Sequence, residues 1–162
     1  MRYAWLTLKH KLFVLLAGLR YTKTPLGLLL LHDLSKLTWA ELPGYQRQFF
    51  RKRKDPTQWA KTWAHHIERN PHHYEHWVQQ VGGRSYAFIM PEEYVREMVA
   101  DWIGASRAYE GRWPRLGAWA WLDKNLERVC GEVHPQTERM IRQVIREWKE
   151  ICLANEAAAP CC

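Results

Sequence analysis

The sequence predicts a single all-α domain, and three observations support this fold class. Apolar residues recur every three or four positions along most of the chain, which is the spacing of one helix face. Thr-Pro, Asp-Pro, Asn-Pro and His-Pro pairs occur where a cap and a first-turn proline would begin a new helix. No two segments alternate as paired strands would. At 162 residues, 47% of them hydrophobic and 25% charged, the chain is long enough to bury one core.

The first two expected helices lie on either side of the T-K-T-P break. Residues 3–20 carry large apolar side chains along one face, which is predicted to border the core. These side chains are Trp5, Leu8, Leu12, Leu15, Leu16 and Leu19. Two lysines and a histidine interrupt the segment, so we interpret it as a helix of the domain and not as a signal peptide. The second helix is expected over residues 25–36.

Shorter elements are expected in the middle of the chain. After the turn T-W-A-E-L-P-G, a short basic helix is predicted over residues 45–53. Asp55 is the expected N-cap of a helix over residues 56–69, because proline suits the first helical position. Asn70 precedes another proline in the same way, which predicts a helix over residues 71–80 and then a V-G-G-R-S-Y loop.

The rest of the chain predicts three more helices. The first covers residues 91–109, and a shorter one follows near residues 118–129 after a Trp- and Gly-rich stretch. H-P-Q-T-E-R opens the last helix, which is expected to reach about residue 154. The domain is therefore expected to span residues 1–154, with residues 155–162 forming a disordered tail.

The net charge indicates the kind of partner, and the cysteine content indicates the cellular compartment. The net charge of +7 favours an anionic partner, and the run R-Q-F-F-R-K-R-K is interpreted as a solvated face that attracts such a partner. No apolar run reaches the about 18 residues that a membrane span needs, so no membrane association is expected. The four cysteines lack C-x-x-C spacing, which favours a cytoplasmic protein without a disulfide framework. A homo-oligomer is left open, and no role is assigned to Cys161 and Cys162.

One stretch joins an apolar run to residues that commonly bind metals. L-L-L-L-H-D-L-S-K places His32 and Asp33 together at the expected end of the second helix, where imidazole and carboxylate could share an ion. His10 lies in the first expected helix, and Asp101 lies in the apolar segment M-V-A-D-W-I. Each residue alone is explained by an ordinary partner, such as a nearby arginine for Asp101. Together they predict a metal site that three helices build.

This pattern resembles the HD-domain superfamily of metal-dependent phosphohydrolases. The matching residues, over roughly residues 5–105, are His10, His32, Asp33, Lys36 and Asp101. The resemblance implies an HD-type helical bundle whose two histidines and two aspartates hold a divalent ion, with Mn, Co, Mg, Fe and Zn not distinguished. N-P-H-H-Y-E-H-W and M-P-E-E-Y-V-R-E-M-V-A-D-W more closely resemble an HD-related family of phages and bacteria whose reaction is not known.

The same resemblance implies roles for individual residues in catalysis. Asp33 would be both ligand and catalytic residue, and Lys36 would contact the phosphate as a compact positive charge. Glu41 stands eight positions after Asp33, where nucleotidases of the superfamily carry a catalytic acid, and it would accept a proton from water. A capping or solvated Glu41 is an equally open alternative.

A histidine-rich stretch, W-A-H-H-I-E-R-N-P-H-H-Y-E-H-W, is the second candidate site. Two-metal members of the HD superfamily carry extra histidines before the final Asp. By that resemblance, His66, His72 and His73 would complete a second metal site bridged by Asp33, or would contact the substrate. Stacking of His66 on Trp63 is the simpler alternative.

The function favoured by the sequence is a metal-dependent phosphohydrolase that acts on a nucleotide or another small phosphate ester through a metal-activated water. The G-Y-P signature of the cyclic-dinucleotide branch is missing, which argues against that substrate. Two alternatives stay open. The extra histidines permit an HD-type di-iron oxygenase, and the basic composition permits a non-catalytic protein that binds nucleic acid or a protein partner.

Overall fold

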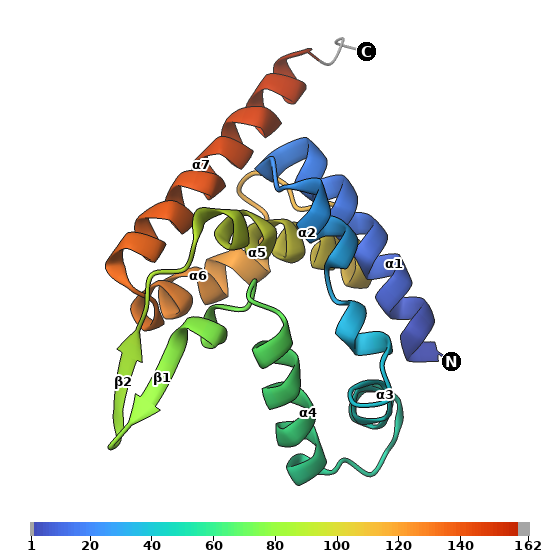
Figure 1. Ribbon diagram of the computed structural model, residues 1–162. Helices are drawn as coiled ribbons and strands as arrows, with labels where there is room; N and C mark the ends of the chain where they lie inside the picture. The colour runs from blue at the N-terminus through green and yellow to red at the C-terminus, as the bar shows by residue number, and fades with distance from the viewer. Residues whose placement is uncertain (1, 159–162) are drawn as a thin grey trace.

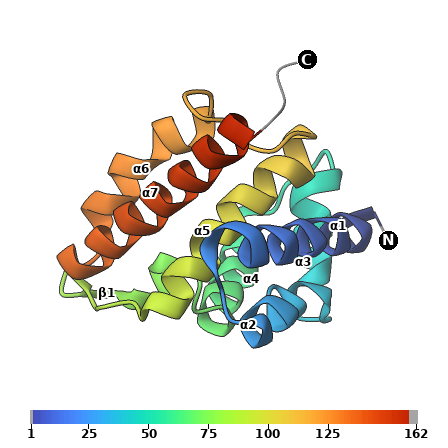
Figure 2. The same cartoon turned by 90° about the horizontal axis from the view of Figure 1, so that it is seen from above.

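Helix α5 (Glu92–Ala105) lies at the centre of the structure, a computed structural model that describes residues 2–158 (Figure 1). Helix α1 (Arg2–Ala17) packs along one side of α5. Helix α7 (Pro135–Ala158) packs on another side and pairs with α6 (Ala120–Glu132), as Figure 2 shows from above. The fold is all-α and forms a single domain, as the sequence predicts.

Three further helices extend the molecule away from the α6–α7 pair. They are α2 (Leu26–Leu31), α3 (Leu42–Phe50) and α4 (Pro56–Arg69), and the short 3₁₀ helix η2 (Leu34–Leu37) links the first two (Figure 1). The expected start of α4 is confirmed, because the Asp55 carboxylate accepts a hydrogen bond from the backbone N–H of Gln58 at 3.0 Å. The first half of the basic run, residues 47–50, belongs to α3, and residues 51–54 lie in the loop before α4, so this helix begins and ends about three residues earlier than the predicted range of 45–53.

The core lies where α1, α5 and α7 meet. Its fully enclosed side chains include Val14, Ile103, Ile141 and Trp148. A glycine sets the distance between α1 and α5: a Cβ at Gly104 would lie 2.7 Å from the backbone nitrogen of Val14. Because such a distance is a clash, only glycine allows the two backbones to approach this closely. This close packing brings the face of α1 that carries His10 against α5.

The predicted orientation of the first helix is wrong. The buried residues of α1 are Tyr3, which stacks on Tyr45 of α3, and Thr7, His10, Val14 and Ala17. Most of the large apolar stripe faces outward, with Trp5 72%, Leu8 49% and Leu12 52% exposed. Leu16 and Leu19 are exposed as well, and Leu15 is half-buried. Where α1 approaches Gly104 most closely, its buried side chain is the small Val14, whereas the larger Leu12 and Leu16 are exposed.

The helix predicted over residues 71–80 is also wrong. A 3₁₀ turn, η3 (Tyr74–Trp77), leads into a hairpin of strands β1 (Val78–Val81) and β2 (Arg84–Ala87), which pair antiparallel with Val81 opposite Arg84. The local signal for this hairpin is the Gly-Gly pair that separates the two short strands. Gly82 and Gly83 have φ values of 57° and 77°, as a two-residue hairpin turn requires.

The remaining boundaries differ less from the predictions. The π-helical segments η1 (Gly18–Thr22) and η4 (Ser106–Glu110) extend α1 and α5, and α7 continues to Ala158, past the predicted end at residue 154. The rest of the predicted tail, including both terminal cysteines, lies outside the described residues. Among the residues that the structure describes, Cys130 and Cys152 form no disulfide. Within residues 2–158, every helix is too short or too polar to cross a membrane.

Candidate metal centre

The four residues that the sequence singles out first lie together in the structure. Nε2 of His10, on α1, is 2.9 Å from Oδ1 of Asp101, on α5, and 3.4 Å from Oδ2 of Asp33. Nε2 of His32 lies 3.4 Å from that of His10 and 3.5 Å from Oδ2 of Asp33. The side chain of Asp101 is 17% exposed and the other three are almost fully buried. We name these four residues cluster A.

The end of α2 explains how two adjacent residues enter one cluster. The helix stops at Leu31, before the motif, so the predicted extension to residue 36 is wrong. His32 leaves the helix with φ −46° and ψ 125°, and Asp33 then adopts a left-handed conformation with φ 58°. Aspartate tolerates this region better than most residues, and strained backbone of this kind gathers at functional sites. The turn aims both side chains at the same point, which a continuous helix would not do.

Lys11 stabilises this turn. Its ammonium group donates to the carbonyl oxygens of Leu30 at 2.5 Å and His32 at 2.8 Å, where the helix leaves acceptors without partners. Burial lowers the pKa of Lys11 despite the opposing effect of Asp33. Lys11 is not among the residues predicted from the sequence, although its position beside His10 is a signal that could have found it.

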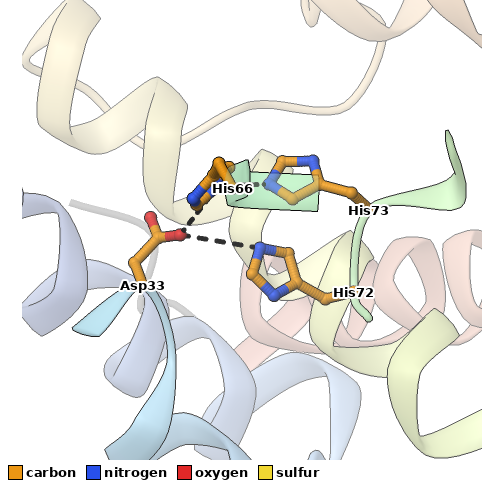
Figure 3. A group of neighbouring side chains, drawn as sticks. All are labelled: Asp33, His66, His72 and His73. Carbon is orange, nitrogen blue, oxygen red and sulfur yellow. Dashed lines mark hydrogen bonds and ion pairs between the residues drawn. The ribbon is translucent and has the colours of Figure 1, made fainter. Parts of the chain in front are cut away.

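A second set of ligands lies against Asp33 (Figure 3). His66 comes from α4, whereas His72 and His73 come from the turn after it, and we name these three histidines with Asp33 cluster B. Their ligand atoms all lie within 4.8 Å of one another. Oδ1 of Asp33 is 3.4 Å from Nε2 of His66 and 3.7 Å from Nε2 of His72, and the Nε2 atoms of His66 and His73 are 2.9 Å apart.

Asp33 connects the two clusters because its two oxygens face different ways. Oδ2 faces His10 and His32 of cluster A, and Oδ1 faces the histidines of cluster B. The side chain is fully buried. Although burial opposes ionisation, Lys36 and His32 hold the pKa of Asp33 well below its usual range. A charged carboxylate therefore stands between two groups of imidazoles.

Two buried carboxylates orient the histidines from behind. Oε1 of Glu97 lies 2.9 Å from Nδ1 of His32 and 3.2 Å from Nδ1 of His72. Glu41 lies 2.8 Å from Nδ1 of His66 through Oε2, and 2.8 Å from Nδ1 of His65 through Oε1. An imidazole that donates its Nδ1–H to a carboxylate presents an unprotonated Nε2 on its other side, as metal-binding histidines do.

These contacts change the interpretation of Glu41 and reveal Glu97. Glu41 is fully enclosed, and both of its oxygens are engaged by histidines, so its place in the structure is that of a positioning residue. Sequence reasoning missed Glu97 altogether. Its signal was the spacing to Asp101, since residues four positions apart on a helix lie on the same face.

Buried polar atoms without hydrogen-bond partners indicate whether the two clusters suit a metal ion. Oδ1 of Asp33 and Nε2 of His72 are shielded from solvent and have no hydrogen-bond partner within residues 2–158. Buried polar groups are normally paired, and leaving one unpaired costs about 1–3 kcal/mol. A divalent ion bound at about 2.1 Å would bring its ligand atoms to about 3–3.5 Å from one another, close to the spacings seen here. The buried groups of both clusters can therefore hold metal ions.

The other histidines of the stretch lie outside the clusters. His65 contacts Glu41, and His76 places its Nδ1 2.8 Å from the carbonyl oxygen of Ile67. The rings of His66 and Trp63 are neighbours, with centroids 5.6 Å apart, but they are tilted by 36° and not stacked, so the contact accompanies the cluster and does not replace it. Asn70, predicted to begin a helix, instead ends α4 and hydrogen-bonds to Ser35 Oγ at 2.7 Å.

The fold and the site together describe an all-α protein whose helices enclose a buried centre of histidines and carboxylates. The chain belongs to DUF5662, a family of unknown function whose sequence profile matches residues 2–147. Neither a curated protein nor a solved structure matches the chain.

Proposed function

We propose that this protein is a metal-dependent phosphohydrolase of the HD type, which acts on a nucleotide or another small phosphate ester. The observation that carries the proposal is the sharing of Asp33 between two clusters of buried nitrogen and oxygen ligands. His10, His32, Asp33 and Asp101 would hold one ion, and Asp33, His66, His72 and His73 a second. Bound divalent ions supply Lewis acidity toward a phosphoryl oxygen and lower the pKa of a coordinated water.

Lys36 supports the choice of a phosphorylated substrate. Its Nζ lies 2.6 Å from Oδ2 of Asp33, and its side chain is only 11% exposed. Although burial opposes the charge, Asp33 raises the pKa of Lys36 well above its usual value. A permanent positive charge at this point would neutralise a phosphate oxygen beside cluster A. The net charge of +7 favours the approach of the same anionic substrates.

The chain's own residues would prepare the site before any substrate arrives. Glu41 and Glu97 contact the Nδ1 atoms of His66, His32 and His72, which would fix the ring orientations and direct each Nε2 toward a bound ion. Tyr109 covers cluster A from one side, with its ring stacked on that of His10 at 5.7 Å between centroids.

A second candidate function rests on the same bridging carboxylate. A carboxylate between two histidine-rich clusters also suits a pair of iron ions, so an HD-type di-iron oxygenase is the alternative. The two functions differ in the metal and in the need for oxygen. A third possibility, a non-catalytic protein that binds nucleic acid, requires neither.

Metal analysis and a substrate screen test the proposal together. The purified protein would be analysed for bound metals, and phosphate release from nucleotides and simple phosphate esters would be measured with added Mn²⁺, Co²⁺, Mg²⁺ or EDTA. We expect metal-dependent phosphate release that is lost in Asp33→Ala and retained in Asp123→Ala, a control on the exposed surface of α6. Bound iron with oxygen consumption would favour the oxygenase instead. No metal binding and no turnover would refute both enzyme functions.

A further inference from the structure

A cavity of about 420 Å³ lies beside the two clusters. Asp101 of cluster A and His73 of cluster B both form part of its wall, so the cavity opens on both candidate metal sites. Its volume falls within the range of pockets that take small organic ligands. A molecule bound here would have one end at the ligand clusters.

Aromatic rings form much of the remaining wall. Trp63, Trp102, Tyr109 and Trp121 line the cavity, and the rings of Trp102 and Trp121 lie 5.1 Å apart between centroids. Flat indole and phenol rings stack on flat ligands and make few demands on the ligand's polar groups. This wall favours a planar ring as the organic part of the substrate.

Besides Asp101, three charged residues line the cavity and add polar groups to its aromatic wall: Glu75, Glu110 and Arg128. Glu75 lines the cavity, and its Oε2 is shielded from water without a hydrogen-bond partner in the described chain. Arg128, from α6, lines the same cavity, and its Nη1 donates to the hydroxyl of Tyr74 at 2.9 Å and to the carboxylate of Glu132 at 3.1 Å, which leaves its other guanidinium nitrogens to a ligand. An unpaired carboxylate oxygen accepts from N–H groups, whereas a guanidinium donates to ring nitrogens and carbonyl oxygens.

Building on the proposed phosphohydrolase, we infer that this cavity binds the base of a guanine nucleotide and that Glu75 determines this specificity. Guanine presents two adjacent N–H donors, at N1 and N2, and the Glu75 carboxylate can accept from both. The acceptors O6 and N7 of guanine suit Arg128, as they suit arginine in other guanine complexes. Adenine lacks a pair of adjacent N–H donors. Uracil has an N–H group between two carbonyl oxygens, and these oxygens would be repelled by the Glu75 carboxylate.

The position of Glu75 in the chain also agrees with a mononucleotide. Glu75 follows His73 of cluster B by two residues, so their Cα atoms are at most about 7 Å apart. A base bound at Glu75 therefore lies within a nucleotide's length of the ligand clusters. The phosphate would then face His73, Asp101 and Lys36.

Nucleoside binding tests the inference without relying on catalysis. Quenching of tryptophan fluorescence would measure the Kd values of guanosine, inosine and adenosine for the wild-type protein loaded with Mn²⁺. Inosine keeps N1–H and O6 but lacks the amino group at C2. We expect guanosine to bind about tenfold or more tightly than either of the others, because a hydrogen bond to a charged group is lost with each. Equal affinities, or no nucleoside binding, would overturn the inference.

A variant assigns the discrimination to Glu75. We expect Glu75→Gln to lose the preference for guanosine over inosine, and Glu68→Gln, an exposed glutamate of α4, to keep it. An unchanged preference in folded Glu75→Gln protein would contradict the assignment. The experiments also distinguish failure of the guanine-binding inference from failure of the proposed phosphohydrolase activity. Selective guanosine binding without phosphate release would leave only this inference standing, whereas phosphate release without any preference among bases would leave only the phosphohydrolase.

Discussion

Oε2 of Glu41 lies 2.8 Å from Nδ1 of His66, on the opposite side of the imidazole from Asp33. Both side chains are fully enclosed. Although burial opposes ionisation, the two neighbouring histidines lower the pKa of Glu41. A charged carboxylate in this place keeps the proton of His66 on Nδ1 and leaves Nε2 to face cluster B.

The first prediction concerns this pair. Replacing Glu41 by Gln removes the charge but keeps the shape, so the fold should persist while His66 loses its fixed tautomer. We expect Mn²⁺ affinity at cluster B to fall by about 10- to 100-fold, the usual effect of losing an outer-shell partner. Calorimetric titration of metal-free protein measures it, with Glu68→Gln as the control. Unchanged affinity would mean that Glu41 does not position the ligand.

The second prediction concerns protons released by metal binding. Although burial opposes the charge, Asp33, Asp101 and Glu97 raise the pKa of His32 to about 10 in the metal-free protein. An imidazole must be neutral to bind a metal ion, so binding at cluster A displaces this proton. Because the displaced proton becomes easier to lose as pH rises, metal affinity should increase by up to about tenfold per pH unit from pH 7 to 9.

Calorimetry in two buffers of different ionisation enthalpy counts the protons released. We expect about one or more per ion at pH 7.5. Asp101→Asn should release fewer, because it removes one of the charges that hold the proton on His32. His76→Gln lies outside both clusters and should behave as the wild type does. Binding without proton release would show that His32 is neutral before the metal arrives.

The third prediction concerns Lys11. Lys11→Met keeps most of the side chain's volume but removes the donor for the carbonyl oxygens of Leu30 and His32. We expect the free energy of unfolding to fall by about 1–3 kcal/mol. Metal affinity at cluster A should fall as well, because the turn that aims His32 is no longer held. Urea unfolding and metal titration measure the two effects, with the exposed Lys149→Met as control. Equal stability of the two variants would contradict the role of Lys11.

The fourth prediction compares two glycines. A Cβ at Gly104 would lie 2.7 Å from the backbone nitrogen of Val14, whereas a Cβ at Gly131 of α6 would meet nothing within 4 Å. Gly104→Ala should destabilise the fold by about 1–3 kcal/mol through overpacking. Gly131→Ala should instead stabilise it by about 0.4–1 kcal/mol, because alanine favours the helix and restricts the unfolded chain. Thermal and urea unfolding of both variants provide the test, and opposite signs are the expected result.

Much of the architecture follows from local signals. Asp55 and the proline after it predict the start of α4 because capping is a property of neighbouring residues. The hairpin could also have been predicted, since Gly-Gly between two short runs is a local signal that the Asn-Pro pair outweighed. The buried face of α1 could not have been predicted from local sequence, because it depends on the close approach of α1 to Gly104, which lies on the distant helix α5. The spacing of the large leucines therefore predicted the wrong buried face for α1.

The candidate site divides in the same way. The sequence by itself determined the all-α class, and it identified the four residues of cluster A, because His32-Asp33, His10 and Asp101 are conspicuous in apolar surroundings. Only the tertiary structure decided that Asp33 turns one oxygen to each cluster and that Glu41 and Glu97 stand behind the histidines. The reason is physical: residue type fixes which bonds a side chain can make, whereas distance and direction depend on how α1, α4 and α5 pack together.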